Sequence, residues 1–72
     1  MMDRYENLAN AIILQAAKDY RRARRRIKKR PQNENAMTRI RDCESFFLSE
    51  WFACLTDIDG ENLLKKLQEE FE

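Results

Sequence analysis

A short stretch of this sequence, residues 18–30, holds nine of the fourteen basic residues of the chain and reads KDYRRARRRIKKR. Asp19 is its only acid, so nine positive charges and one negative charge leave a local net charge of +8, against +1 for the whole chain. Residues 31–72 carry ten acids and four bases, a net charge of −6. Six of the nine bases are arginines, whose guanidinium groups bind phosphate or carboxylate through paired hydrogen bonds. The stretch therefore predicts a surface for phosphate-rich or acidic partners.

Cys43 and Cys54 are the next residues whose chemistry could matter, and the sequence has no histidine. Both lie in one predicted helix, where their spacing corresponds to about 16 Å of rise. A disulfide needs Cα atoms within about 7 Å, so the two cannot pair in a straight helix. A zinc site is not supported either, because there is no histidine and no second cysteine pair. We expect two free, buried thiols, which fits a reducing cytoplasm.

The segment DIDG at residues 57–60 is similar to part of a calcium-binding loop, but the register excludes one. If Asp59 and Gly60 stood at loop positions five and six, Leu55 and Lys66 would stand at positions one and twelve. Neither side chain can ligate calcium. We interpret Asp59 instead as the N-cap of a helix.

The sequence contains no recognisable catalytic group. No histidine is present to activate a serine or a cysteine, and a single glycine cannot build a glycine-rich phosphate loop. We therefore expect no enzyme activity, no cofactor and no metal. No run of about 18 apolar residues is present, so we expect no membrane span and a cytoplasmic location.

The first predicted helix covers residues 3–29 and has two different faces. Apolar residues recur three and four positions apart, which places them in one stripe at 100° per residue. The stripe consists of Tyr5, Leu8, Ile12, Ala16, Tyr20, Ala23 and Ile27, widened at its start by Ala9 and Ile13. Tyr20 could stack on a nucleic-acid base, but its place on the stripe favours packing in the core.

The basic residues of this helix are our candidates for partner binding. The candidates are Lys18, Arg21, Arg22, Arg24, Arg25, Arg26, Lys28 and Lys29. Like charges at these spacings cost helix stability, which favours a binding role. The alternative is a face that is only solvated.

Pro31 ends the first helix, and Asn33 is a suitable N-cap for a second helix over residues 34–55. Its apolar stripe is Met37, Ile40, Phe47, Leu48, Trp51, Cys54 and Leu55, and we expect Trp51 at the centre of the core. A third helix over residues 60–71 turns Leu63, Leu64, Leu67 and Phe71 inward. The sequence thus predicts one all-α domain, residues 1–72. Residues 3–29 and 34–55 would form an antiparallel helical hairpin, and the shorter helix would pack across it.

Several apolar residues fall outside these stripes and predict self-association. Phe46 points away from the main stripe of the second helix, Phe52 lies between its two faces, and Leu14 lies on the back of the first helix. A three-helix monomer does not obviously cover all three side chains. We expect a homo-oligomer, a dimer in the simplest case.

Two stretches resemble small all-helical accessory proteins encoded by phages and integrated elements of Gram-positive bacteria. They are AIILQAAKDYR at residues 11–21, and SEWF at residues 49–52 followed by TDIDGE at residues 56–61. The resemblance carries no site residue; it implies a bacterial cytoplasm. By analogy with small phage proteins, it also implies action by binding: some of these proteins bind nucleic acid, and others block host defence proteins by occupying their nucleic-acid channels or sequestering their nucleotide signals.

Two hypotheses follow. In the first, the protein is a non-enzymatic binding protein whose basic helix face engages nucleic acid, a nucleotide or an acidic host protein. In the second, it is a structural or assembly protein whose oppositely charged halves complement each other between copies.

Overall fold

The computed structural model of the protein describes the backbone of residues 4–71 and the side chains of residues 8–71. These residues form four α-helices and no strand: α1 (Arg4–Lys29), α2 (Glu34–Phe47), α3 (Glu50–Leu55) and α4 (Gly60–Glu69). The predicted all-α class is confirmed. The predicted start of the first helix at Asp3, the side chain of Tyr5 and the terminal Glu72 lie outside the described residues.

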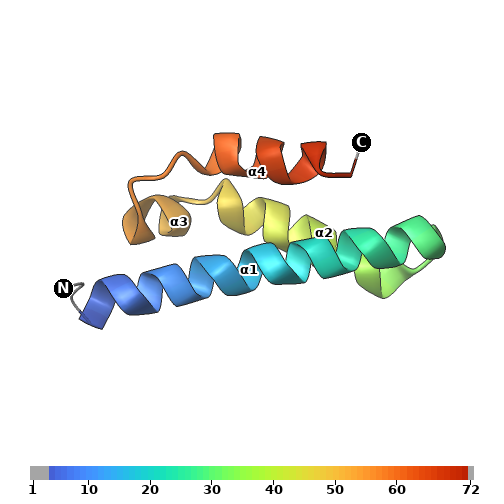
Figure 1. The fold of residues 1–72 in the computed structure, drawn as a ribbon, viewed down its shortest axis with the longest axis horizontal. Helices are drawn as coiled ribbons and strands as arrows, with labels where there is room; N and C mark the ends of the chain where they lie inside the picture. The colour runs from blue at the N-terminus through green and yellow to red at the C-terminus, as the bar shows by residue number, and fades with distance from the viewer. Residues whose placement is uncertain (1–3, 72) are drawn as a thin grey trace.

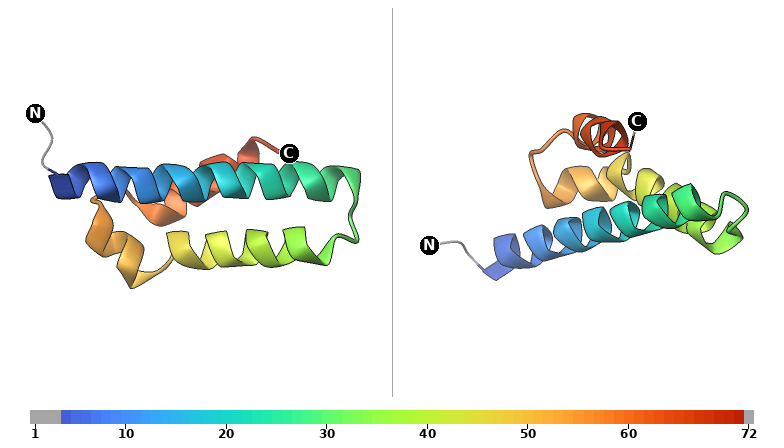
Figure 2. Two further views of the ribbon diagram at one scale, coloured as in Figure 1. Left: turned by 90° about the horizontal axis from the view of Figure 1, so that it is seen from below. Right: turned by 45° about the vertical axis from the view of Figure 1, so that its right-hand side comes forward.

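The helices form an elongated molecule of 42 × 19 × 19 Å (Figure 1). α1 spans most of its length, and α2 runs beside it in the opposite direction (Figure 2). α3 turns away at the end of α2, and α4 returns along the pair. The turn between α1 and α2 and the loop between α3 and α4 therefore lie at opposite ends (Figure 1).

The predicted second helix is two helices, so the prediction of three helices is wrong. α2 ends at Phe47, and Ser49 has an extended backbone (φ −83°, ψ 160°) that begins α3. The Ser49 hydroxyl donates to the carbonyl oxygen of Phe46 at 2.6 Å and accepts from the backbone N–H of Phe52 at 3.2 Å. One side chain thus caps the end of one helix and the start of the next, which stabilises the break.

The break reverses two predictions about neighbouring aromatic residues. Trp51, the expected core centre, is 59% exposed, while Phe52, an expected self-association residue, is 1% exposed. The reason is geometric: the break re-aims α3, so positions after it do not continue the stripe of α2. Leu48, also on the predicted stripe, lies at the break and is exposed.

The buried line of α1 differs from the predicted stripe in its first half. Tyr20 and Ala23 are buried as predicted, but Leu8 and Ile12 are exposed. The residues buried there are the neighbouring Ala9, Ile13 and Ala17. Both lines have helical spacing, and the line that packs inward combines Ile13 with the small residues Ala9 and Ala17.

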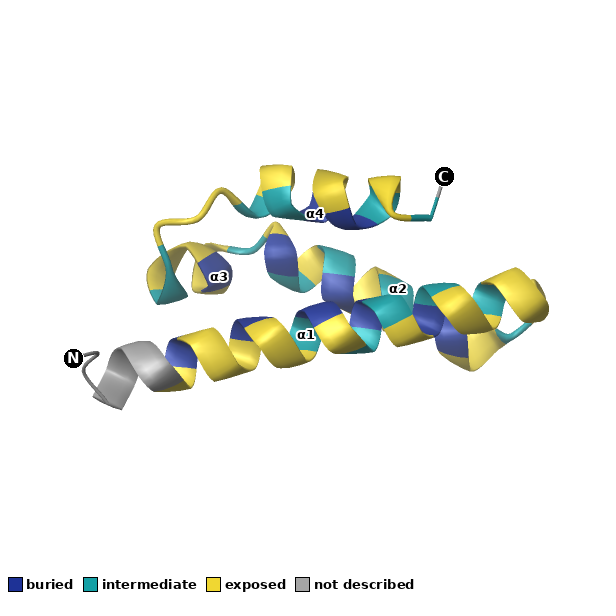
Figure 3. Cartoon of the chain, in the orientation of Figure 1, coloured by how far each residue is buried: buried dark blue, intermediate teal, exposed yellow. Residues whose placement is uncertain are grey.

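Aromatic and aliphatic side chains from all four helices meet in one core. Phe47 packs edge-on against Tyr20 and Phe52, with ring centroids 6.5 Å and 5.7 Å away, and Leu64 and Leu67 complete the cluster. The buried positions line the inner sides of the helices, as Figure 3 shows. The expectation of two buried free thiols holds for Cys43 only. Cys54 is free but exposed.

The predicted helix starts are confirmed at both loops. The Asn33 side chain accepts from the N–H of Ala36 at 3.1 Å, and the Asp59 carboxylate accepts from the N–H of Glu61 at 3.0 Å. Gly60 has a packing role as well, because a Cβ atom there would collide with the carbonyl oxygen of Phe47. The glycine lets α4 begin directly against the end of α2.

Candidate functional site

The C-terminal half of α1 positions the eight predicted partner-binding residues, but they do not share one environment. Six are exposed: Lys18, Arg22, Arg25, Arg26, Lys28 and Lys29. We call these six the basic face. Arg21 and Arg24 are half-buried on the side of α1 that meets the end of α4.

Arg21 is engaged in a two-point ion pair with Glu70. Its Nε and Nη2 atoms donate to the two carboxylate oxygens at 2.9 Å and 3.0 Å. The hydrogen bond from Arg21 lowers the pKa of the Glu70 carboxyl, and the same bond raises the pKa of the guanidinium. The acid that follows α4 is thus held against α1 by a base.

Arg24 is also engaged within the fold. Its guanidinium carbon lies 5.9 Å from the ring centroid of Tyr20 and 5.5 Å from that of Phe71. Both distances suit cation–π attraction. Arg21 and Arg24 therefore hold the C-terminal segment of the chain, and replacing Arg21 would disturb packing as well as charge.

Tyr20 is fully buried, which confirms core packing over base stacking. Its hydroxyl donates to Glu44 Oε2 at 3.2 Å, and the Gln68 amide donates to the same oxygen at 3.1 Å. Burial raises the pKa of the Tyr20 phenol, and the Glu44 charge raises it further. This shared acceptor links α1, α2 and α4.

A recess of about 220 Å³ lies between α1 and α2 beside the basic face. We call it the basic groove. α1 contributes Asp19, Arg22, Ala23 and Arg26, and α2 contributes Asn35, Ala36 and Arg39. Arg39 was missed in the sequence because it lies outside the basic stretch. The sequence signal that could have identified Arg39 is the predicted antiparallel hairpin. Its turn at residues 30–33 brings the first two turns of α2 beside Arg22 and Arg26.

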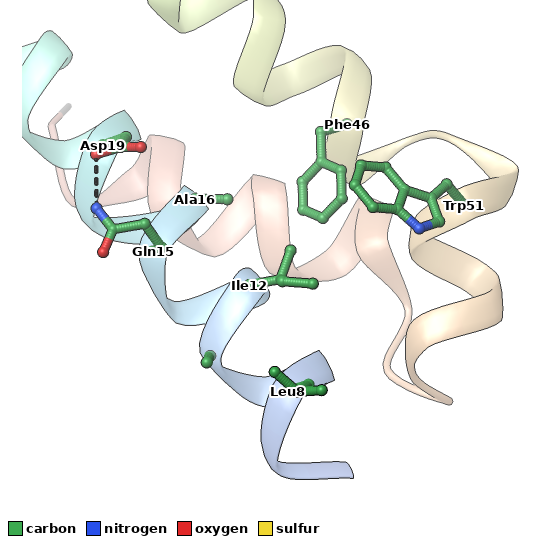
Figure 4. Close-up of a pocket in the computed structure, with 8 residues that line it drawn as sticks. Leu8, Ile12, Gln15, Ala16, Asp19, Phe46 and Trp51 are labelled. Carbon is green, nitrogen blue, oxygen red and sulfur yellow. Dashed lines mark hydrogen bonds between the residues drawn. The ribbon is translucent and has the colours of Figure 1, made fainter. Parts of the chain in front are cut away.

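A second hollow, of about 490 Å³, lies at the other end of α1. We call it the apolar groove; it is lined by Leu8, Ala11, Ile12, Gln15, Ala16, Asp19, Phe46 and Trp51. Figure 4 shows Leu8 and Ile12 on α1 facing the rings of Phe46 and Trp51. Those two rings pack edge-on with centroids 5.3 Å apart.

The three predicted self-association residues have different places. Phe46 is half-buried and lines the apolar groove, Phe52 is buried, and Leu14 is 60% exposed outside the groove lining. Phe52 is therefore not available for an interface, and its prediction is corrected. Leu8, Ile12 and Trp51 take its place as exposed apolar side chains.

Within residues 4–71, none of the helices combines the length and the apolar character that a membrane span needs. Among the side chains of residues 8–71, no three cysteine, aspartate or glutamate residues gather as metal ligands. Comparison with protein-family models, curated proteins and solved structures finds no match to this chain.

Proposed function

We propose that this protein is a non-enzymatic binding protein whose basic face on α1 binds the phosphate backbone of nucleic acid. The observation that supports this most is the exposure of the six cations. Among the described side chains, Arg21–Glu70 is the only ion pair, so no described acid pairs with the basic face.

The charge on the basic face is costly to the fold, which favours a role outside it. Like charges three and four positions apart destabilise a helix. Only the last turn, with Arg26, Lys28 and Lys29, gains from the helix dipole. The helix dipole therefore does not explain the presence of Lys18, Arg22 and Arg25. The proposed binding of phosphates does explain it.

The geometry suits a backbone rather than a base sequence. From Lys18 to Lys29 the face is about 16 Å long, which is enough to contact several phosphates. Phosphate contacts position a nucleic acid without reading its bases. We expect weak sequence preference and a logarithmic salt dependence with a slope of roughly −4 to −5 if all six cations bind phosphates.

The test compares two triple variants of equal charge. The first is Arg25→Gln, Lys28→Gln and Lys29→Gln on the basic face. The control is Arg41→Gln, Lys65→Gln and Lys66→Gln, three exposed cations elsewhere. Both remove one arginine and two lysines, so both lower the net charge by three.

The proposal expects the first variant to lose binding to single- or double-stranded oligonucleotides in a mobility-shift titration, while the control binds nearly as wild type. Equal weakening of the two variants would show a net-charge effect and contradict a defined face. The setting we propose, on the phage-type resemblance, is the bacterial cytoplasm. There an acidic host defence protein or a nucleotide signal is the alternative partner for the same residues.

The apolar groove favours a second function, self-assembly. Leu8, Ile12 and Trp51 expose apolar surface on one side of the molecule, and a second copy would cover it. Sedimentation should then show a concentration-dependent dimer that Ile12→Gln weakens. A monomer at high micromolar concentration would exclude this function.

A further inference from the structure

The basic groove brings cations together from two helices. Arg22 and Arg26 are four residues apart on α1 and therefore share one side of it. Arg39 reaches the groove from α2. A wider hollow of about 510 Å³ at the turn has Arg30 as its only charged lining residue. A third hollow, of about 240 Å³, is lined by Asn33 and by three cations, Arg26, Lys29 and Arg30, which lie on α1 and directly after it. Of these three hollows, the basic groove is the one that arginines from both α1 and α2 line.

Small residues make room for a ligand in this groove. Ala23 and Ala36 are 3% and 2% exposed, and they line the groove between the longer polar side chains. The Asn35 amide adds a neutral hydrogen-bond donor. A compact group with several acceptor oxygens fits such a lining.

The charge of the groove indicates which anion fits. Three arginines and Asp19 leave a net charge of +2. Asp19 is held by the Gln15 amide, which donates to its carboxylate at 3.0 Å. A phosphomonoester carries about −1.5 to −2 at pH 7, whereas each phosphodiester of a backbone carries about −1. The groove therefore complements a monoester better.

We infer that the basic groove between α1 and α2 binds a terminal phosphate group, the phosphomonoester at the end of a nucleic-acid strand or of a free nucleotide. The inference rests on the proposed function and assigns a division of labour to it. The four residues of the basic face that do not line the groove, Lys18, Arg25, Lys28 and Lys29, follow the continuing backbone, and the groove receives the end. Arg22, Arg26 and Arg39 are the binding residues.

The experiment compares one oligonucleotide with a 5′-phosphate and with a 5′-hydroxyl, by anisotropy of a 3′ label. Wild type should bind the phosphorylated strand about tenfold more tightly, as expected for charge-assisted hydrogen bonds. Arg39→Gln should reduce this ratio to about one while keeping the affinity for the 5′-hydroxyl strand. Arg41→Gln, an exposed arginine of α2 outside the groove, should keep the full ratio.

A nucleoside 5′-monophosphate, titrated alone by calorimetry, distinguishes the two sources. Saturable binding that Arg39→Gln abolishes would identify a free nucleotide as a ligand. A preference seen only with the strand would identify the strand end. Both results support the inference.

Other outcomes overturn it. Equal binding of the two strands by wild type would contradict phosphate binding in the basic groove, but it would be compatible with backbone binding by the basic face. The same follows if Arg39→Gln weakens both strands alike. Binding of neither strand and of no nucleotide would contradict both the proposed function and the groove. Binding of the nucleotide without either strand would contradict only the proposed binding to the nucleic-acid backbone. Arg26→Gln is the second groove variant and should also lower the ratio of affinities for the two strands, whatever it does to the affinity for the 5′-hydroxyl strand. Circular dichroism checks that each variant is folded.

Discussion

The two halves of α1 present opposite chemistry along one side of the same helix. In the first half, Leu8 and Ile12 border the apolar groove; in the second half, Arg22 and Arg26 border the basic groove. Asp19 lines both hollows and marks the boundary. Beneath both halves the buried line of α1 continues without interruption, from Ala9 to Ala23.

This contrast shows that the core and the surface of α1 are specified by different residues. The buried line needs small or closely packed side chains, while the bordering positions are free to be apolar or basic. Substitutions at the border should therefore change binding more than stability, and substitutions in the buried line should do the reverse.

The largest expected effect tests the same contrast between buried and exposed positions at two adjacent aromatic residues of α3. Phe52→Ala should destabilise the protein by about 3–5 kcal/mol, because the side chain is buried among Phe46 and Phe47. Trp51→Ala should cost no more than about 1 kcal/mol, since the indole is largely exposed. Urea denaturation measures both. Similar losses in the two variants would contradict the described break at Ser49.

The break explains what the sequence could and could not predict about the fold. Helical periodicity was sufficient for the all-α class, and the residue types at the two loops were sufficient for the Asn33 and Asp59 caps. It was not sufficient for the end of α2, because the pattern of residues 34–55 is compatible with one long helix. Apolar residues on two faces of that pattern were interpreted as a need for a partner; they are explained by two helices pointing in different directions.

An intermediate effect is expected at Tyr20, which lies at the boundary of the two halves. Tyr20→Phe removes a hydrogen bond to Glu44 and should cost about 1 kcal/mol at pH 7. The pKa of the phenol is raised in the folded state, so the unfolded chain loses this proton first. Wild type should therefore lose stability as the pH rises above about 10.

The variant lacks this ionisation, so the stability difference should shrink at alkaline pH. Cys43 acts in the same direction, because burial raises the pKa of its thiol, but it is common to both proteins and cancels. Thermal melts from pH 7 to pH 11 measure the effect. A constant difference over this range would contradict the buried phenol.

The smallest effect is expected from Glu70→Gln, which frees Arg21 at the edge of the basic half. The ion pair is exposed, so the loss of stability at pH 7 should be smaller than in Tyr20→Phe. Because Arg21 lowers the pKa of Glu70, this contribution is present above the ordinary glutamate pKa and is lost as the pH falls through the lowered value. Melts over a series of pH values from 7 down to 2 test this; a stability difference that stays constant over the whole series would contradict it.

The candidate site could be predicted only in part. The basic stretch and its helix are plain in the sequence, and six of the eight residues are exposed as a binding role requires. Arg21 and Arg24 make their contacts within the fold because the end of α4 lies beside α1. Arg39 reaches the groove because of the way α2 packs against α1. Both are tertiary relations between segments far apart in the chain, which local periodicity does not contain.

Ala23 and Ala36 have a consequence for how the protein could vary over evolution. They are buried between α1 and α2 and also line the basic groove. A larger residue at either position would wedge the two helices apart and spread the arginines that face each other across the groove. The basic groove therefore restricts which residues can replace Ala23 and Ala36 over evolution. An anion that bridges the two helices would raise the melting temperature of the whole molecule.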